Sequence, residues 1–379
     1  MLPFFSQDHS ALQAQVRLWA KNNLFAGHES EDDLDQRARD LIKQLGIAGF
    51  LKHAVPRQFG GARKQVAARD LCILREELAR GDALADTMFA LQALGSFPIT
   101  LAGSAAQKQN YLPRVASGAA IAAFAITEPL AGSDVASLQT TAVRQDEQFV
   151  LNGTKRFISN AGIADFYVVF ASTAPEKKAK GVSAFIVDAN TPGLAVTEKT
   201  KVLSPHPIGV LEFTDCVVSQ SALLGAEGEG LKIAFETLDL LRCSVGAAAV
   251  GFAQRALEEA IQYSKARRQF GRAIGEFQGI QFKLAEMATE LEAARLLVYQ
   301  AAWAYDCGGE EPKQKSSMAK LYATEAAQRV VDQSLQIHGG TGVVVGNIME
   351  RLYRDVRALR IYEGTSEIQK LVIARELLK

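Results

Sequence analysis

The feature that most constrains the fold is a change of hydrophobic period that happens twice along the 379 residues. From the start to about residue 120, and again from about residue 229 to the end, apolar residues recur every three or four positions, which is typical of amphipathic helices. Between these parts, short runs rich in Val, Phe, Ile, Tyr and Thr are separated by Asn-Gly, Pro-Gly and Gly, which is typical of strands and turns. The order predicts an α+β protein with a β domain between two helical parts, because the alternating βα units of most nucleotide enzymes are not seen in it.

Three domains are predicted from this order. A chain of 379 residues is long for one core, since single hydrophobic cores stop growing at about 250–300 residues. We expect an N-terminal helical domain over residues 1–120, a middle antiparallel β domain over 121–228 and a C-terminal helical bundle over 229–379. The short runs of the middle part suit a small sandwich or barrel, and Asn152-Gly153 predicts a hairpin turn within it.

Composition excludes several classes of protein. With 48% hydrophobic and 22% charged residues the chain is neither disordered nor membranous. Lys plus Arg equals Asp plus Glu at 42 each, so no net field would draw the chain to nucleic acid or to an anionic membrane. The N-terminus lacks the features of a secretory signal, and apolar runs stay below the ~18 residues of a membrane-spanning helix. We therefore expect a cytoplasmic protein without membrane insertion.

The four cysteines are Cys72, Cys216, Cys243 and Cys307. They are far apart and show neither a CxxC pair nor the spacing of metal ligands. We expect buried thiols in a reducing compartment and no metal site.

A candidate catalytic segment lies near the C-terminus. Glu363 follows an apolar pair and precedes Gly364, so the chain can turn sharply there and let a ligand approach the backbone. Thr365 is the predicted N-cap of a helix that follows. A glutamate held against apolar neighbours loses hydration, which raises its pKa toward the range of a general base. The alternative is that Glu363 and Glu367 are ordinary acidic residues favoured by the positive end of the helix dipole.

A second candidate segment is AAFAITEPLAGSDVASLQTTA at 122–142. Gly132 and Ser133 can offer backbone N–H groups and a hydroxyl to a polar ligand, while Phe124 and Ile126 offer an apolar face. On these residues alone, a structural role as a strand that ends in a turn is the favoured interpretation.

Four motifs together resemble the acyl-CoA dehydrogenase family of FAD-dependent flavoproteins. These are TEPLAGSD at 127–134, RRQFG at 267–271, QIHGGTG at 336–342 and YEGT at 362–365. They occur in the family's order and the resemblance extends over essentially the whole chain. It implies that the C-terminal part is a four-helix bundle and that FAD lies between domains, since no GxGxxG follows a strand.

The resemblance also implies which residues contact FAD. Phe157 and Ser159 stand where the family usually has Trp and Thr, beside the isoalloxazine ring and near its N5 atom. Arg267 would reach the FAD pyrophosphate of a neighbouring subunit, which its planar guanidinium suits, although Arg267 and Arg268 could otherwise simply cap a helix dipole. The implied FAD contacts are Phe124, Ile126, Thr127, Gly132, Ser133, Phe157, Ser159, Arg267, Phe270, Gln336, Gly339, Gly340, Thr365 and Glu367.

The substrate contacts implied by the resemblance are Ser133, Asp239, Arg242, Tyr362 and Gly364. A subset of the family carries its base at the position of Leu241, and a leucine cannot accept a proton. Glu363 is then the one candidate base that the family pattern supports. We interpret His338 as a packing residue.

The implied reaction is the α,β-dehydrogenation of an acyl-CoA in fatty acid metabolism. Glu363 would remove the α-proton, the β-hydride would go to flavin N5, and the electrons would pass to an electron-transferring flavoprotein. A homotetramer is implied as well. The alternatives are an acyl-CoA oxidase, a reductase or a flavin monooxygenase of the same fold, or a flavin-binding partner protein without turnover.

One segment departs from the family pattern. KVLSPHPIGVLEF at 201–213, with Pro205, His206 and Pro207, differs from the basic, glycine-containing segment expected there. That stretch borders the CoA entrance in the family, so the resemblance leaves the acyl group open.

Overall fold

The computed structural model describes residues 4–24 and 33–379. The chain forms two compact units. The first consists of the described part of Met1–Glu29 with Ala67–Asp86 and Asp239–Lys379, and the second of the described part of Ser30–Val66 with Thr87–Leu238. These units divide the chain elsewhere than the predicted limits 1–120, 121–228 and 229–379, which stay a prediction.

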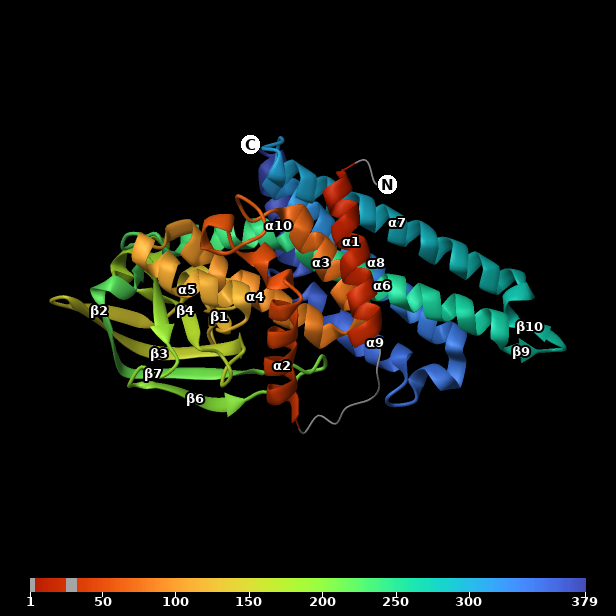
Figure 1. The fold of residues 1–379 in the computed structure, drawn as a ribbon, viewed down its shortest axis with the longest axis horizontal. Coiled ribbons are helices and arrows are strands. Elements are labelled where there is room, and N and C mark those ends of the chain that lie inside the picture. Colours follow the sequence, from red (N-terminus) through yellow and green to blue (C-terminus); the bar gives the residue numbers. More distant parts are fainter. Residues whose placement is uncertain (1–3, 25–32) are drawn as a thin grey trace. The chain divides into compact units, whose positions relative to one another are not determined.

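The order of helices, then strands, then helices is confirmed (Figure 1). The first helices are α1 (Gln7–Asn23), α2 (Leu34–Ile47), α3 (Ala68–Gly81), α4 (Ala83–Ala102) and α5 (Ala105–Ser117). The strands are β1 (Ala122–Ala125), β2 (Thr141–Gln145), β3 (Gln148–Ser159), β4 (Phe166–Ser172), β5 (Val182–Asp188), β6 (Leu194–Lys199), β7 (Ile208–Ser219) and β8 (Leu223–Leu224). The last elements are α6 (Gly230–Ala266), β9 (Arg268–Gln269), β10 (Arg272–Ala273), α7 (Gln278–Asp306), α8 (Pro312–His338), α9 (Ile348–Arg357) and α10 (Ser366–Leu377).

The first unit is helical. Within it α1 packs on α3, α3 on α7, α7 on α8, and α8 on both α9 and α10. Small residues let these helices approach closely. A Cβ at Gly246 of α6 would lie 2.8 Å from the Cγ2 atom of Val298 on α7, so only glycine fits there without a shift. This tight core carries the segment that contains Glu363.

The second unit is built on an eight-stranded sheet with the order β6-β7-β3-β2-β4-β5-β8, and β1 pairs with β4. Most pairings are antiparallel, as predicted, but β1 and β2 each pair with β4 in parallel. Every residue of β4 is buried, so β4 forms the centre of the sheet.

The predicted hairpin at Asn152-Gly153 is wrong, because β3 continues through both residues. Its pairing with β7 shifts register between Leu151 and Gly153, which marks a bulge rather than a turn. The hairpin turn instead connects Gln145 of β2 with Gln148 of β3, and Asp146 adopts φ 52 there. An Asn-Gly pair suits both a turn and a bulge, and strand pairing decided between them.

Helix α4 fixes the strand that leads into the TEPLAGSD loop. Gln92 on α4 donates to the Ala120 carbonyl at 2.8 Å and accepts from the Ala122 amide at 2.7 Å. A Cβ at Gly95 would lie 2.7 Å from the Ala122 Cβ, so the helix rests directly on β1. The start of the loop is therefore set by buried contacts.

Three of the four cysteines are buried as expected, but Cys307 is exposed at the end of α7. Within residues 4–24 and 33–379, no group of three or more His, Cys, Asp or Glu is arranged to hold a metal ion. In the same ranges, no helix combines the length and the apolar character needed to cross a bilayer.

Candidate active site

The backbone at Glu363 turns back on itself before α10. Glu363 and Gly364 have φ values of 52° and 89°, and the left-handed region is unfavourable for a glutamate. The predicted N-cap is confirmed, because the Thr365 hydroxyl accepts from the Ile368 amide at 3.3 Å. The side chain of Gln369 then donates to the carbonyls of Glu363 and Gly364 at 3.3 and 2.9 Å. The helix therefore holds the turn that presents Glu363.

The carboxylate of Glu363 is half-buried, and its Oε2 atom is fully buried without a hydrogen-bond partner among the described residues. Burial raises the pKa of Glu363, while the positive charges of Arg75, Lys320 and Arg242 oppose that rise. The direction agrees with the expectation from the sequence. A raised pKa makes the carboxylate a stronger proton acceptor, which suits a general base.

Each of the three cations is held in place by the same helical unit. The Arg75 guanidinium on α3 donates to both oxygens of Asp86 at 2.8 and 2.9 Å. Arg242 on α6 donates to Asp239 at 2.6 Å. Lys320 on α8 is wholly buried and donates to the Gly364 carbonyl at 2.6 Å, and burial lowers its pKa to about 8. The implied substrate contact Arg242 thus acts on the pKa of Glu363, and Asp239 is its partner.

Arg75 and Lys320 were missed by the sequence analysis. Both lie far along the chain from Glu363, on helices whose patterns suit ordinary amphipathic packing. The available signal was a lysine on the alanine-rich side of α8, since Lys320 lies between the buried residues Ala319 and Ala323. A lysine among apolar neighbours needs a partner, so it indicates a special site.

Glu367 differs from Glu363 in its surroundings. It is exposed in the first turn of α10, and hydrogen bonds from its own backbone amide and from Thr365 lower its pKa. This geometry suits an acidic residue at a helix N-terminus.

The other implied FAD contacts of the helical unit lie at two helix ends. Arg267 is exposed after α6, and Phe270, in the β9–β10 turn, is 93% exposed with φ 51. Gln336, Gly339 and Gly340 are exposed around the end of α8. His338 is buried and stacks on Tyr263 at a centroid distance of 4.3 Å, as a packing residue would. Because Tyr263 lies on α6, this stack brings the two helix ends together.

In the sheet unit, a buried ion pair shapes the TEPLAGSD loop. Lys155 of β3 donates to Glu128 at 2.7 Å and to the Ile126 carbonyl at 3.2 Å. Glu128 also accepts from the amides of Gln139 and Thr140 at 2.5 and 3.0 Å. Burial lowers the pKa of Lys155 to about 8 despite the nearby carboxylate. The ion pair therefore joins the start of the loop, at Ile126, to its end, at Gln139 and Thr140.

The sheet unit brings Thr127 next to the strand that carries two other implied FAD contacts. The Arg156 amide donates to the Thr127 carbonyl at 2.9 Å, so the end of β1 lies beside β3, which carries Phe157 and Ser159. Phe157 is 49% exposed and has φ 56. Gly132 and Ser133 are exposed on the loop, and a Cβ at Gly132 would meet no atom within 4 Å.

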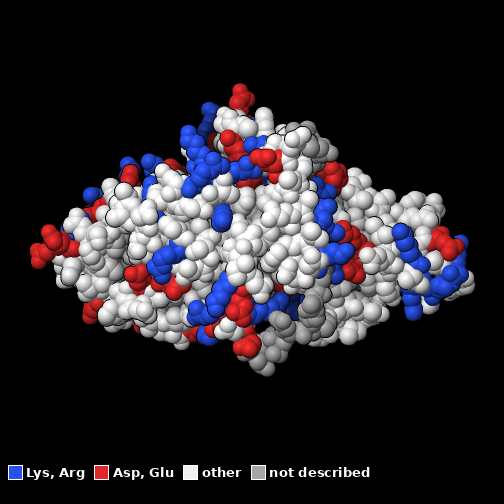
Figure 2. Space-filling model, viewed as in Figure 1, with Lys and Arg blue, Asp and Glu red and all other residues white. Residues whose placement is uncertain are grey.

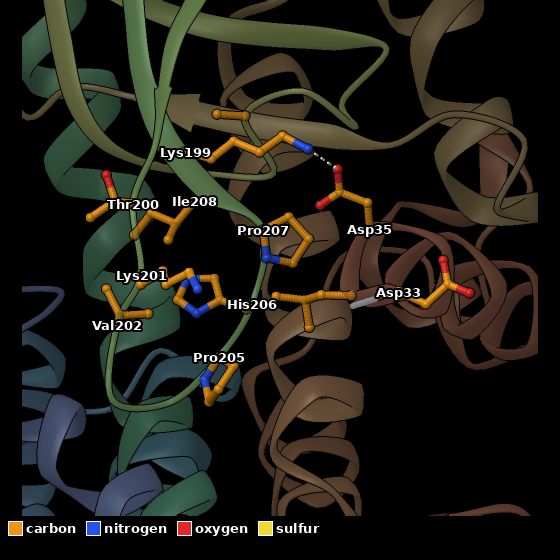
Figure 3. Close-up of a pocket in the computed structure, with 12 residues that line it drawn as sticks. Asp33, Asp35, Lys199, Thr200, Lys201, Val202, Pro205, His206, Pro207 and Ile208 are labelled. Carbon is orange, nitrogen blue, oxygen red and sulfur yellow. Dashed lines mark hydrogen bonds and ion pairs between the residues drawn. The ribbon is translucent and has the colours of Figure 1, made fainter. Parts of the chain in front are cut away.

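A cavity that sequence reasoning did not predict lies beside Ser159. It has a volume of about 330 Å³, and its lining includes Lys199, Lys201, His206, Asp33 and Asp35 (Figure 3). Lys199 and Asp35 form an ion pair at 2.6 Å. The Ser159 hydroxyl lies 3.0 Å from the His206 Nε2 atom. The segment that departs from the family pattern therefore contacts an implied FAD residue.

Charges of both signs are interspersed over the face of the molecule shown in Figure 2. This distribution fits the equal numbers of acidic and basic residues.

Comparisons with known proteins agree along the whole chain. Family models described as the N-terminal, middle and C-terminal domains of acyl-CoA dehydrogenase match residues 6–119, 123–216 and 228–378. An acyl-CoA dehydrogenase of Bacillus subtilis (strain 168) is 42% identical over 376 residues, covering 98% of both chains. An acryloyl-CoA reductase (NADH) of Anaerotignum propionicum is also 42% identical, over 98% of this chain and 96% of the relative.

Solved structures give the same result. The butyryl-CoA dehydrogenase of Megasphaera elsdenii has a TM-score of 0.92 and 34% identity, with 99% of each chain covered. An acyl-CoA dehydrogenase of Bacillus anthracis complexed with FAD has a TM-score of 0.90 and 32% identity, covering 99% of this chain and 67% of that one.

Proposed function

The chain belongs to the acyl-CoA dehydrogenase family of FAD-dependent oxidoreductases, and from this premise we propose that it catalyses the α,β-dehydrogenation of an acyl-CoA thioester with Glu363 as the base. One observation carries the proposal. Glu363 holds a buried oxygen without a hydrogen-bond partner among the described residues, and burial raises the pKa of its carboxyl group.

Glu363 accepts the α-proton of the thioester in this proposal. Before the transfer its carboxylate is stabilised by Arg75, Lys320 and Arg242, whose charges oppose the effect of burial. After the transfer the carboxyl group is neutral, and burial favours that form. Backbone amides beside Glu363 orient the thioester carbonyl and stabilise the negative charge that develops on its oxygen.

The described residues fit FAD as the cofactor. Phe157 and Phe270 are exposed aromatic rings on residues with left-handed backbones, as expected where strain serves a ligand. Thr127, Ser133 and Ser159 offer hydroxyl groups to a ligand, and Arg267 offers an exposed guanidinium that suits a pyrophosphate. FAD, when bound, supplies the acceptor for the β-hydride.

The remaining proposed contacts follow the family resemblance. Thr365 and Glu367 join the FAD contacts, and Tyr362 and Gly364 join the substrate contacts beside the base. The proposal extends to a homotetramer that passes its electrons to an electron-transferring flavoprotein.

The test is anaerobic bleaching of the bound flavin by a panel of linear, branched and aromatic acyl-CoAs. We expect Glu363→Gln to slow bleaching by the best substrate by about 10²–10⁴-fold, which is the usual contribution of a general base. Glu376→Gln is the matched control, because Glu376 lies on the same helix, bonds to Lys379 and belongs to neither set of implied contacts, and this variant should bleach within about tenfold of the parent rate. Parent-like bleaching by Glu363→Gln would overturn the proposal, as would a folded protein that takes up no FAD.

A reductase running in the opposite direction is the second candidate. It is favoured by the acryloyl-CoA reductase relative, whose identity to this chain equals that of the dehydrogenase relative. Reoxidation of the reduced flavin by an enoyl-CoA that is faster than bleaching by the matching acyl-CoA would identify the reductase.

A further inference from the structure

Residues 201–213, the segment that departs from the family pattern, are fixed to the end of β3. His206 lies between Pro205 and Pro207, both of which line the cavity beside it (Figure 3). The Asn160 amide donates to the Pro207 carbonyl at 2.7 Å. The backbone that follows His206 is therefore anchored next to Ser159.

The hydrogen bonds of His206 determine its tautomer. Its Nδ1 atom lies 3.0 Å from the Ser204 carbonyl oxygen. A carbonyl only accepts, so Nδ1 must carry the proton. In the neutral ring, Nε2 is then an acceptor, and it lies 3.0 Å from the Ser159 oxygen. The Ser159 hydroxyl consequently donates its single proton to His206 and presents only lone pairs elsewhere.

We propose that His206 is a positioning residue that sets the direction of the Ser159 hydroxyl and thereby decides whether Ser159 can donate a hydrogen bond to the flavin. With a neutral imidazole, Ser159 is an acceptor toward a ligand. With an imidazolium, both ring nitrogens donate, so Nε2–H donates to Ser159 and the hydroxyl proton is free to point at the ligand. The inference rests on the proposed function, in which Ser159 contacts FAD.

The two states of Ser159 suit different ligand atoms. N5 of an oxidised isoalloxazine ring is an acceptor, so the hydroxyl donor that it needs is available only when His206 is protonated. Burial lowers the pKa of His206. Binding of oxidised FAD should raise that pKa, because the bound state favours the imidazolium, and linkage then makes FAD bind more tightly as pH falls.

Charged groups on the neighbouring elements also face this cavity. Lys199 ends β6, Lys201 follows it, and Asp33 and Asp35 lie at the start of α2. Lys199 is paired with Asp35 at 2.6 Å. The cavity thus presents both signs of charge to His206. The direct contact between the imidazole and an implied FAD residue is the one from His206 to Ser159.

The experiment is a pH titration of the flavin absorption spectrum in the FAD-loaded, full-length protein without any acyl-CoA. We expect one spectral transition between roughly pH 5 and 8, the range in which histidine titrates. His206→Gln and Ser159→Ala should both lose it, while Ser159→Thr, which keeps the hydroxyl, should retain it. FAD affinity of the parent should rise by up to about tenfold per pH unit on acidification through the transition, and that dependence should vanish in His206→Gln.

The matched control is His338→Gln. His338 is a second histidine whose Nδ1 atom bonds to a backbone carbonyl, at 2.7 Å from the Ser334 oxygen, so this variant should keep the transition. A parent-like transition in His206→Gln or in Ser159→Ala would overturn the inference. If acyl-CoA bleaches the parent flavin but His206→Gln titrates like the parent, the inference alone fails. If the titrations behave as expected but no acyl-CoA bleaches the flavin, the proposed reaction alone fails.

Discussion

Two buried lysines, one in each compact unit, reach the same pKa by burial but have different partners. Lys155 and Lys320 are both fully buried, and each has its pKa lowered to about 8. Each also donates to a backbone carbonyl of a candidate-site segment. Lys155 is additionally bound to the Glu128 carboxylate at 2.7 Å, whereas Lys320 influences Glu363 only through its charge.

The difference in partners gives the two lysines different roles. Lys155 holds a loop through its bond to Glu128, whereas Lys320 adjusts the pKa of the candidate base Glu363. The carboxylate of Glu128 is fully engaged by Lys155 and two amides, so it stays charged and ties the loop to β3. Glu363 keeps an oxygen without a hydrogen-bond partner in the described chain, so its protonation can change without breaking a bond. A direct ion pair at Glu363 would hold the carboxylate in its charged form and weaken it as a base.

The largest effect on stability is expected from breaking the buried ion pair of Lys155 and Glu128. Lys155→Met leaves Glu128 buried without its cation, which should lower the free energy of unfolding by about 3–5 kcal/mol. Chemical denaturation measures it. The double variant Lys155→Met/Glu128→Gln should recover part of the loss, because no buried charge remains. A loss below about 1 kcal/mol in Lys155→Met would show that the pair does not hold the loop.

Replacing Lys320, which acts on Glu363 only through its charge, should have a smaller effect on stability. Lys320→Met removes the bond to the Gly364 carbonyl, but Gln369 still donates to that oxygen, so we expect a loss of about 1–2 kcal/mol. Because Lys320 opposes the rise of the pKa of Glu363, its removal should raise that pKa further. The pH dependence of flavin bleaching should then move to higher pH. A move to lower pH would contradict the proposed charge balance.

Glu363→Gln should sharpen the contrast by stabilising the protein slightly. A carboxyl group whose pKa is raised on folding contributes stability below its unfolded pKa and loses that stability as pH rises through the folded pKa. At a pH above the raised pKa the ionised carboxylate is therefore a net cost, and its removal should raise the free energy of unfolding. The difference in melting temperature from the parent should shrink toward pH 4. Destabilisation at pH 7 would indicate that the cations outweigh burial.

The smallest effect is expected from an exposed pair. Arg144 and Glu227 form a salt bridge at 2.5 Å, with side chains 41% and 39% exposed. Arg144→Gln should cost about 0.2–1 kcal/mol, and less at high salt, because solvent screens such pairs. Thermal melts at low and high salt measure this reference value, and a cost equal to that of Lys155→Met would remove the distinction between buried and exposed pairs.

The parts that could be predicted from the sequence depend on residues close together in the chain. The cap at Thr365 and the raised pKa of Glu363 follow from a few adjacent residues. The cations around Glu363 come from α3, α6 and α8, and the partner of Ser159 is 47 positions away. The misplaced hairpin at Asn152-Gly153 has the same cause, since strand register depends on partners that a local pattern does not contain.

The left-handed backbone at Glu363 means that the residue needed as the proposed base is not the residue that makes this position most stable. A glutamate held at φ 52 is strained by about 1–3 kcal/mol, whereas glycine, or to a lesser degree asparagine, adopts that conformation readily. A laboratory selection for heat resistance alone would therefore drift toward glycine or asparagine at 363. The most heat-resistant variants from such a selection would have an unstrained backbone at position 363 but no carboxylate there to accept the proton.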